Sequence, residues 1–386
     1  MFCDPVTTNE ILRIIHNIPN NKAPGNDNIN SQLHKEVSDV IAQPLTYIFN
    51  LSFETGIVPD LLKIAKVIPI YKKGERNSPS NYRPISLLSI FDKILEKLMY
   101  KRLSNFLETN KILYKYQFGF RKNHSTSQAV MEVVDKIYQY CDNREVTTGI
   151  FLDLQKAFDT VNHPILIEKL ATYGIREIVL KWFISYLSNR KQYTVLSNCK
   201  SKPESVSYGV PHGSVLGPLL FVIYMNDIQY AVSNAELKLF AMILTFLHNS
   251  DPNKLFAEAN VSITQLSERF AANRLSLNLN KTCYSVFGTK QRITTQFKLY
   301  INGKEIQNTE SCKYLGIFID CDLKWQTHIN YVRNKLLKFT SIFYKISTKL
   351  PEHILKMIYF AFVHSQLLYG IEVHANTTPT HLSKLH

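Results

Sequence analysis

The sequence lacks the features that mark membrane proteins and disulfide-stabilised proteins. Its longest apolar run, residues 237–247, contains Lys238 and is well short of the ~20 residues that a membrane-spanning helix needs. Residues 1–10 show no basic stretch followed by an apolar one, so no secretory signal is predicted. The six cysteines are scattered, and none has the C-x2-C spacing of a zinc site. We therefore expect a reduced, intracellular chain, nuclear or cytoplasmic, with no membrane contact.

Acidic residues are scarce relative to basic ones. The chain has 31 Asp and Glu against 45 Lys and Arg, which gives a net charge of +14. Such an excess favours a polyanionic partner, because basic side chains neutralise phosphates and release counterions. A soluble basic protein with no such partner is the alternative on charge alone. With 386 residues, 45% of them hydrophobic, the chain is long enough for one large domain or two to three smaller ones.

Helices and strands alternate without a repeating βαβ pattern, and this favours an α+β fold. Helices are expected over residues 31–56, 90–107, 163–173, 177–187, 218–227 and 255–273, and from residue 327 onward. Strands are expected at residues 66–71, 149–154, 193–196 and 313–320, with residues 237–246 forming two strand arms around a tight turn. The strand predicted at residues 149–154 contains one acid, Asp153, in an otherwise apolar setting.

Four segments, taken in order, carry a more specific signal. They read VIPIYKKG (67–74) with NYRPISLL (81–88), FLDLQKAFD (151–159) with VNH (161–163), GVPHGSVLGPLLF (209–221) with YMND (224–227), and KYLGI (313–317). Together they resemble the polymerase domain of reverse transcriptases, or RNA-directed DNA polymerases, from non-LTR retrotransposons of the insect-element type. The resemblance covers residues 22–320. It implies a right-hand polymerase fold with fingers, a palm built on an antiparallel sheet, and a partial helical thumb.

The resemblance also implies a domain organisation and a set of partners. We expect an N-terminal helical extension at residues 1–60, fingers and palm at residues 61–320, and a partial helical thumb at residues 321–386. The full-length elements usually carry an endonuclease before the polymerase domain, so the chain is expected to be a fragment or remnant. The implied partners are an RNA template, a DNA primer and dNTPs, while the oligomeric state stays open.

Nucleotide addition is phosphoryl transfer, and the family performs it with two Mg²⁺ ions held by carboxylates. The resemblance makes Asp153 a metal ligand. The alternative is a strand-end acid that is hydrogen-bonded to backbone amides. Lys281, in the segment NKT (280–282), matches a lysine that can protonate the leaving pyrophosphate. A lysine that simply faces solvent is the alternative there.

The family match assigns further residues to the nucleotide. They are Lys72, Lys73 and Arg83 for the triphosphate, Phe158 beneath the sugar, and His212 and Gly213 in the segment that positions the nucleotide. A basic turn suits phosphate because arginine binds two oxygens at once, although charged turns are more often only solvated. Phe158 could equally be an ordinary core residue. The family usually has Gln at the position of His212, which puts nucleotide positioning in question.

Residues that contact template or primer are assigned in the same way. Arg121, in FGFRKNHST (118–126), is a candidate for the template backbone. Tyr314, Leu315 and Gly316 match the hairpin that holds the primer end.

The strongest departure from the family pattern lies at residues 240–247, which read FAMILTFL. The family has Phe-Ala-Asp-Asp here, so Met242 and Ile243 stand at the two acid positions. Neither side chain offers oxygen to Mg²⁺, and Asp153 alone supplies too few carboxylates. Our hypothesis for the pair is a local reading-frame change, from one deletion and one nearby insertion: GAU GAU ACU encodes Asp-Asp-Thr, and read one nucleotide later it gives AUG AUA CU, which encodes Met-Ile-Leu. The cause is then either decay of an old element or an error in the recorded sequence.

The sequence therefore predicts a reverse transcriptase whose polymerase activity is severely impaired as written. A catalytically dead, nucleic-acid-binding remnant of the element is the main alternative. A third possibility is an unrelated basic structural protein, against which the four ordered segments argue.

Overall fold

The computed structural model describes residues 1–197, 199–240, 243–288, 298–375 and 377–385. These residues form two compact units, each assembled from separate stretches of the chain. The first unit comprises Met1–Lys115, Lys156–Asp227 and Ala272–Leu275, and the second comprises Tyr116–Gln155, Ile228–Ala271 and Ser276–His386. Both contain helices and sheets without a regular βαβ repeat, which confirms the predicted α+β class.

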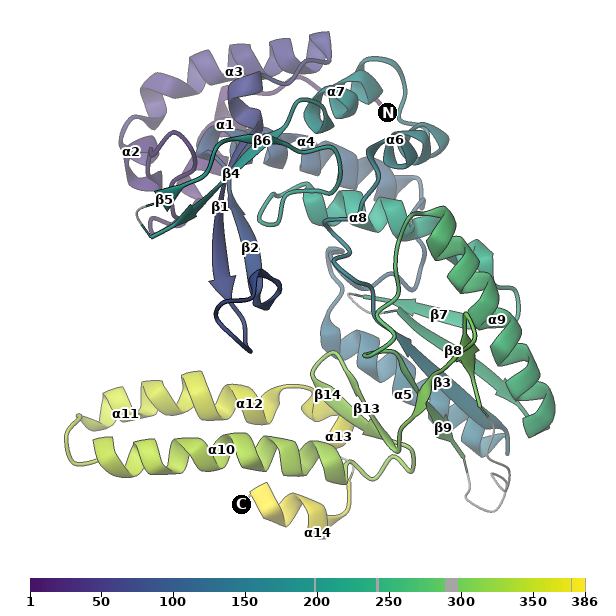
Figure 1. Ribbon diagram of the computed structural model, residues 1–386. Helices are drawn as coiled ribbons and strands as arrows, with labels where there is room; N and C mark the ends of the chain where they lie inside the picture. The colour runs from purple at the N-terminus through teal and green to yellow at the C-terminus, as the bar shows by residue number, and fades with distance from the viewer. Residues whose placement is uncertain (198, 241–242, 289–297, 376, 386) are drawn as a thin grey trace. The chain divides into compact units, whose positions relative to one another are not determined.

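Helices are the main regular structure of the first unit (Figure 1). They are α1 (Thr8–His16), α2 (Ser31–Glu36), α3 (Ser38–Thr55), α4 (Ile90–Thr109), α6 (His163–Thr172), α7 (Glu177–Leu187) and α8 (Gly217–Met225). The helix predicted over residues 31–56 is interrupted at Val37 and ends where Gly56 adopts a left-handed conformation, with φ 70°. Glycine takes this conformation without the strain that a Cβ atom would add.

A small mixed sheet completes the first unit. Its strands are β1 (Ile64–Tyr71), β2 (Tyr82–Leu87), β4 (Lys191–Leu196), β5 (Cys199–Lys200) and β6 (Glu204–Ser205). Strand β1 pairs antiparallel with β2 and parallel with β4, so β1 is central and the β1–β2 hairpin forms one side. The hairpin loop contains the basic residues Lys72 and Lys73, as predicted for this turn.

A five-stranded sheet forms the centre of the second unit, in the order β12-β9-β3-β8-β7. Its strands are β3 (Val146–Leu152), β7 (Glu236–Leu239), β8 (Ile243–Asn249), β9 (Cys283–Phe287) and β12 (Gln307–Asn308). The two arms predicted within residues 237–246 are β7 and β8, which pair antiparallel from Leu239 opposite Ile243. Every residue of β3 is buried, as expected for a central strand covered on both faces.

Two helices cover this sheet, α5 (Thr126–Asp142) and α9 (Pro252–Ala272). Phe151 of β3 packs with α5 in one hydrophobic cluster. On the neighbouring strand Tyr284 lies opposite Ile150, and its ring is 6.2 Å from that of Phe256 on α9. Because adjacent residues of a strand face opposite sides, α5 and α9 lie on opposite faces of the sheet.

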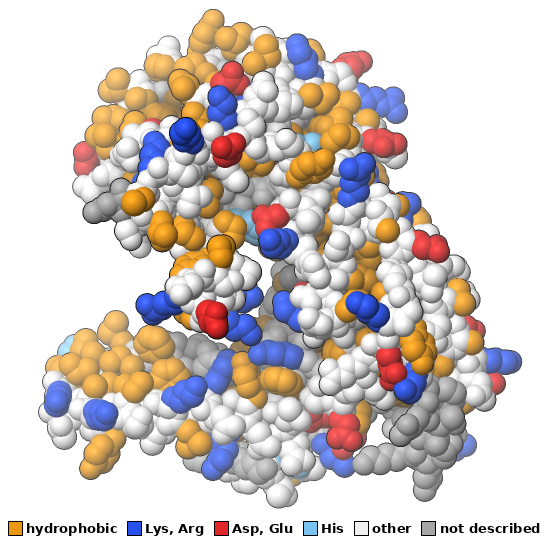
Figure 2. All heavy atoms as spheres, viewed as in Figure 1, with side chains coloured by type: hydrophobic (Ala, Val, Ile, Leu, Met, Phe, Trp, Pro, Cys, Tyr) orange, Lys and Arg blue, Asp and Glu red, His pale blue; other side chains and the backbone are white. Residues whose placement is uncertain are grey.

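The rest of the second unit consists of short hairpins and helices. The strands are β10 (Tyr300–Ile301), β11 (Lys304–Glu305), β13 (Ser311–Tyr314) and β14 (Ile317–Asp320). The helices are α10 (Gln326–Ile346), α11 (Glu352–Ile358), a π-helical turn (Tyr359–His364), α12 (Ser365–Leu368), α13 (Ile371–His374) and α14 (Pro379–Leu382). The prediction of helix from residue 327 onward is confirmed. Lys and Arg side chains lie beside exposed hydrophobic ones on these helices (Figure 2).

Within the described ranges, no helix has both the length and the apolar character required to cross a bilayer.

Candidate functional site

Asp153 lies at the carboxyl end of the central strand of the second unit. Strand β3 ends at Leu152, so Asp153 follows the strand directly, whereas the sequence predicted it inside the strand. The side chain is 19% exposed, which leaves its carboxylate open to partners from one side. Its backbone carbonyl accepts a hydrogen bond from the backbone N–H of Asn278 (2.8 Å). That bond fixes the segment around Asn278 beside the end of β3.

The Asp153 carboxylate is held by two side chains from that segment. Its Oδ2 accepts from Lys281 Nζ at 3.0 Å and from Asn278 Nδ2 at 3.3 Å. The turn is ordered by the backbone N–H of Lys281, which donates to the Asn278 carbonyl at 3.0 Å. The structure therefore brings together the two residues predicted as catalytic, as an ion pair. Since Lys281 is 60% exposed, solvent weakens the attraction between the charges.

Ile243 enters the sheet beside Asp153. It begins β8 and pairs with Leu152, the residue that precedes Asp153. Its side chain is 5% exposed and thus belongs to the apolar interior of the sheet. Met242, the other position of the expected acid pair, lies outside the described residues.

The donors at this end of the sheet do not fit a two-magnesium centre. Mg²⁺ needs hard oxygen ligands in octahedral geometry, and proteins usually supply carboxylates. Here one carboxylate is present in Asp153, and an ammonium group already occupies it. Within the described ranges, no group of three or more His, Cys, Asp or Glu side chains could hold a metal ion.

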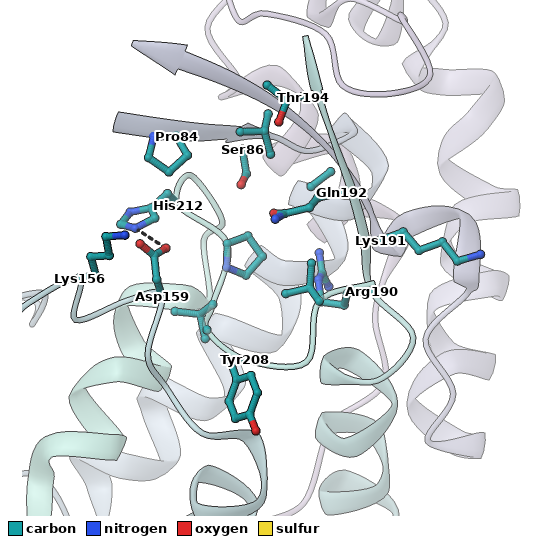
Figure 3. A pocket seen from close by; sticks show the side chains of 16 residues that line it. Pro84, Ser86, Lys156, Asp159, Arg190, Lys191, Gln192, Thr194, Tyr208 and His212 are labelled. Atoms are coloured by element: carbon teal, nitrogen blue, oxygen red, sulfur yellow. Dashed lines mark ion pairs between the residues drawn. The ribbon is translucent and has the colours of Figure 1, made fainter. Parts of the chain in front are cut away.

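A cavity of about 390 Å³ lies in the first unit, between the small sheet and the segment around His212 (Figure 3). Its labelled lining residues are Pro84, Ser86, Lys156, Asp159, Arg190, Lys191, Gln192, Thr194, Tyr208 and His212. Three of these are basic and several others are polar, a composition suited to an anionic ligand with hydrogen-bonding groups.

His212 and Asp159 face each other at one wall of this cavity (Figure 3). His212 Nε2 lies 3.1 Å from Asp159 Oδ1, and the His212 ring centroid is 5.2 Å from that of Phe158. Phe158 also approaches Phe221 at 4.9 Å. Phe158 is only partly buried and lies beside a lining residue. The position of Phe158 is thus compatible both with the predicted contact to the nucleotide sugar and with an ordinary packing role.

Gly213 follows His212 and is required by the chain's own backbone. Its φ is +114°, and a Cβ atom there would lie 2.6 Å from the carbonyl oxygen of Ser86. In the same place the backbone N–H of Ser86 donates to the His212 carbonyl at 2.7 Å. At Gly213 the backbone that approaches closely is that of strand β2, and the role of this segment in positioning the nucleotide stays a prediction.

The three basic residues assigned to the triphosphate lie on the β1–β2 hairpin. Lys72, Lys73 and Arg83 are all exposed, and the Lys72 backbone N–H donates to the Asn81 carbonyl at 2.9 Å. Pro84 and Ser86 of β2 line the cavity, and side chains alternate along a strand, so Arg83 projects to the other face. The structure thus groups Lys72, Lys73 and Arg83 with one another but places them outside the cavity lining.

The cavity residues that the sequence reasoning missed are Lys156, Arg190 and Lys191. Lys156 was within the quoted segment at residues 151–159, and its φ of +46° marks an unusual turn. Arg190 directly precedes strand β4, and Lys191 is the first residue of that strand. A basic pair between a helix and a strand was the signal available in the sequence.

Beneath the cavity, four side chains form a buried polar cluster: Asp92, Glu96, Tyr186 and Arg190. Arg190 lies 3.7 Å from Asp92 and stacks over the Tyr186 ring at 4.8 Å. Burial raises the pKa of the Asp92 carboxyl well above its usual value, and the neighbouring Glu96 raises it further. Burial also raises the pKa of Glu96, against the opposing effect of the Tyr186 hydroxyl.

Glu96 connects this cluster to the segment that carries His212. One carboxylate oxygen accepts from the Tyr186 hydroxyl, and the other accepts from the backbone N–H of Val215 at 2.6 Å. A buried acid on α4 therefore fixes the loop that forms the cavity wall.

The hairpin predicted to hold the primer end is formed by β13 and β14. Leu315 and Gly316 make its tight turn, both with positive φ (47° and 91°), as a two-residue hairpin turn requires. Tyr314 is fully buried, with its ring 6.0 Å from that of Phe151. The Tyr369 hydroxyl donates to the Leu315 carbonyl. Tyr314 thus packs beneath the hairpin, whereas the turn at Leu315 and Gly316 is partly exposed.

Arg121, the template candidate, lies in the second unit between Gln117 and α5. The Gln117 segment is fixed to β7, since the Phe118 backbone N–H donates to the Leu239 carbonyl at 2.7 Å. A Cβ atom on Gly119 would lie 2.8 Å from the Phe240 carbonyl, so glycine is needed for this contact.

Comparison with known proteins decides the family. Residues 70–319 match the family model described as reverse transcriptase (RNA-dependent DNA polymerase), and this span is well over half of the chain. The chain belongs to the reverse transcriptase family. The matched span begins within the first of the four quoted segments and ends just after the fourth, whereas the resemblance was expected to begin at residue 22.

Its relatives include retrotransposon proteins from Drosophila. The RNA-directed DNA polymerase from mobile element jockey of Drosophila melanogaster is 30% identical over 98% of this chain and 42% of its own length. The probable RNA-directed DNA polymerase from transposon BS, also of Drosophila melanogaster, is 32% identical over 84% of this chain and 37% of its own length. A relative from transposon X-element is 30% identical over 85% of this chain. The chain spans about two fifths of the length of these relatives. Its similarity to them confirms the predicted membership of the non-LTR group.

Proposed function

We propose that this chain is the polymerase region of a retrotransposon reverse transcriptase that is impaired in nucleotide addition. The relatives are named as RNA-directed DNA polymerases, which supports RNA as template, DNA as primer and dNTPs as substrates. Impairment rests on one observation: the carboxylates at the end of β3 and the start of β8 are reduced to Asp153.

The division of labour we propose follows the family pattern. Residues 1–60 form an extension, residues 61–320 the fingers and palm, and residues 321–386 a partial thumb. Asp153 is the remaining metal ligand and Lys281 the candidate proton donor. We place the nucleotide near His212, Gly213 and Phe158, because the basic cavity lies beside them.

The hairpin residues Lys72, Lys73 and Arg83 are proposed to reach the triphosphate from β1 and β2. Arg121 and the turn at Leu315 and Gly316, supported by Tyr314, are proposed to contact template and primer. The ion bound by an intact centre is proposed to be Mg²⁺, since the ligands that the family pattern places there are carboxylates.

Primer extension tests the impairment directly. Purified protein receives a primed RNA template, dNTPs and Mg²⁺, in parallel with the variant Met242→Asp/Ile243→Asp. We expect little extension by the unaltered chain and extension by the variant, because two carboxylates are restored beside Asp153. The matched control is Met242→Asn/Ile243→Asn, which adds polar side chains of similar size but no charge.

The outcomes separate the two accounts of this chain. Robust primer extension by the unaltered protein would show that nucleotide addition is not impaired, contrary to our proposal. Extension by the Asp variant and by the Asn control alike would show that polarity rather than metal binding matters. No extension by a folded Asp variant favours the second candidate function, a catalytically dead nucleic-acid-binding remnant.

A salt series tests nucleic-acid binding independently of catalysis. The net charge of +14 leads us to expect that affinity for a primed RNA template falls as salt rises. Affinity that does not change with salt would contradict phosphate contact. The reading-frame explanation is tested by resequencing: codons for residues 242–244 unlike AUG AUA CU would reject it.

A further inference from the structure

Two cysteines from different sheets meet inside the second unit. Cys283 is the first residue of β9 in the five-stranded sheet, and Cys312 lies in β13 of the neighbouring hairpin. Their Sγ atoms are 3.3 Å apart although the residues are 29 positions apart in the chain. Cys312 is 1% exposed and Cys283 is partly exposed. One sulfur is therefore reachable from solvent and the other is held behind it.

Two hydroxyl groups lie against the buried sulfur of the pair. Cys312 Sγ lies 3.1 Å from Ser285 Oγ and 2.9 Å from Thr309 Oγ1. The Cys312 thiol beside Cys283 lowers the pKa of the Cys283 thiol from 9.0 to about 7, against the opposing effect of burial. The pKa of Cys312 is raised, because its proton is shared with Cys283 and because it is buried. Cys283 is thus the nucleophile of the pair and Cys312 the resolving thiol.

We propose that Cys283 and Cys312 form an oxidative modification site, at which a hydroperoxide converts the two thiols into one disulfide. A disulfide needs an S–S distance of about 2.05 Å, so the sulfurs have to approach by about 1.3 Å. The inference does not depend on polymerase activity, since the bond and its consequences are read on the protein itself.

The reaction balances in two steps. The Cys283 thiolate attacks one peroxide oxygen, the O–O bond breaks, and the other oxygen leaves as hydroxide and takes up a proton to become water. This gives a sulfenic acid at Cys283. The Cys312 sulfur then loses its proton and attacks the Cys283 sulfur, the S–O bond breaks, and hydroxide leaves as a second water. The two thiols lose two electrons and the peroxide gains them; a small thiol reductant reverses the change.

The consequence is a covalent link between two parts proposed to work on the primer and the metal. Cys283 follows Lys281, which holds Asp153, by two residues, and Cys312 lies on the hairpin whose turn is Leu315–Gly316. Reduced, these parts are joined only by packing and hydrogen bonds such as that from the Ser285 hydroxyl to the Thr309 carbonyl (2.6 Å). Oxidised, the hairpin is fixed to the end of β9.

The experiment treats the full chain with hydrogen peroxide, blocks remaining thiols with a maleimide after unfolding, and maps cysteines by peptide mass spectrometry. We expect two of the six cysteines to be protected and a linked peptide joining Cys283 to Cys312. The linked peptide disappears in Cys283→Ser and in Cys312→Ser. It persists in Cys199→Ser, the matched control at an exposed cysteine.

Two further readouts guard against a variant that misfolds and against non-specific oxidation. In the unaltered protein, the oxidised form melts at a higher temperature than the reduced form, and a thiol reductant removes the difference. The rate of thiol loss rises at a lower pH than for an ordinary thiol, because the Cys312 thiol lowers the pKa of Cys283. Full maleimide labelling of Cys283 and Cys312 after peroxide overturns the proposal. So does cross-linking spread evenly over all cysteines, or oxidation that ends at a sulfinic acid on Cys283.

Discussion

Replacement of Arg190 by leucine is the sharpest test of the structure around the nucleotide cavity. Arg190 is 2% exposed and lies 3.7 Å from Asp92, in a cluster that also buries Glu96 completely. Leucine keeps part of the volume but removes the guanidinium. Two buried acids then lose the cation that faces them, and Glu96 is the group that fixes the cavity loop through Val215.

The size of the effect follows from the burial. Removing one partner of a buried ion pair costs about 3–5 kcal/mol, because the remaining charge stays unsolvated. The free energy of unfolding of a domain is only about 5–15 kcal/mol, so Arg190→Leu is expected to remove a large part of it. For a unit of this size the loss corresponds to a fall in melting temperature of roughly 10 °C.

The assay is urea unfolding at neutral pH, with near-UV circular dichroism to follow the first unit's only tryptophan, Trp182. Trp182 is fully buried and stacks on Tyr186 of the cluster at 5.5 Å, so its signal reports on this region. The matched control is Asp92→Asn, which removes one acid but leaves Arg190 facing Glu96, so no buried charge is left without a counter-charge; we expect its stability to be unchanged or higher. The double variant recovers part of the loss. A cost below about 1 kcal/mol for Arg190→Leu, or an equal cost for Asp92→Asn, would refute the reasoning.

Three further predictions follow from the same contacts. Burial raises the pKa of Asp92 in the folded state, so the protonated Asp92 stabilises the fold below its ordinary pKa of 3.8, and this stabilisation is lost as pH rises through the raised pKa. Urea unfolding at a series of pH values should therefore show Asp92→Asn gaining stability relative to the unaltered protein as pH rises. Lys281→Met should change the free energy of unfolding by less than about 1 kcal/mol, since its pair with Asp153 is largely exposed; a larger loss in thermal unfolding contradicts this. Ile243→Asp should lower the free energy of unfolding measured in urea by about 3 kcal/mol or more, because a charge replaces a side chain that is 5% exposed. An unchanged free energy would mean that water reaches this position.

Hydrophobic spacing predicted most long elements from the sequence. The helix expected at residues 177–187 is α7 with the same limits, and the two strand arms around residue 240 are β7 and β8. These segments have strong periodicity or a continuous apolar run, so local pattern and tertiary packing agree. Helix α5 was missed although Ser125 and Gln128 form a capping box, and that signal was present in the sequence.

The candidate site was predictable only in part, because contacts between distant segments are not written in local pattern. The pairing of Asp153 with Lys281 joins residues 128 positions apart, and no spacing rule foretells it. The close contact of Gly213 with the Ser86 carbonyl on another strand likewise has no signal in the local sequence. The buried acids on α4 gave no sign in the sequence, since their partners Tyr186 and Arg190 arrive from α7 and the turn after it.

At residue 243 of the sheet, the requirements of packing differ from those of metal binding. Ile243 lies in the interior opposite Leu152, so an apolar residue there satisfies the packing of β3 and β8. The acid that remains, Asp153, does not stand unpaired, because Lys281 neutralises it. If the two carboxylates of the family pattern were lost here, as we propose, their loss would remove repulsion without leaving a buried charge, and the packing of the sheet would not depend on a metal ion. Nucleic-acid binding and primer extension therefore measure different properties. The cavity and the basic surfaces of the first unit can persist unchanged in a protein that no longer adds nucleotides.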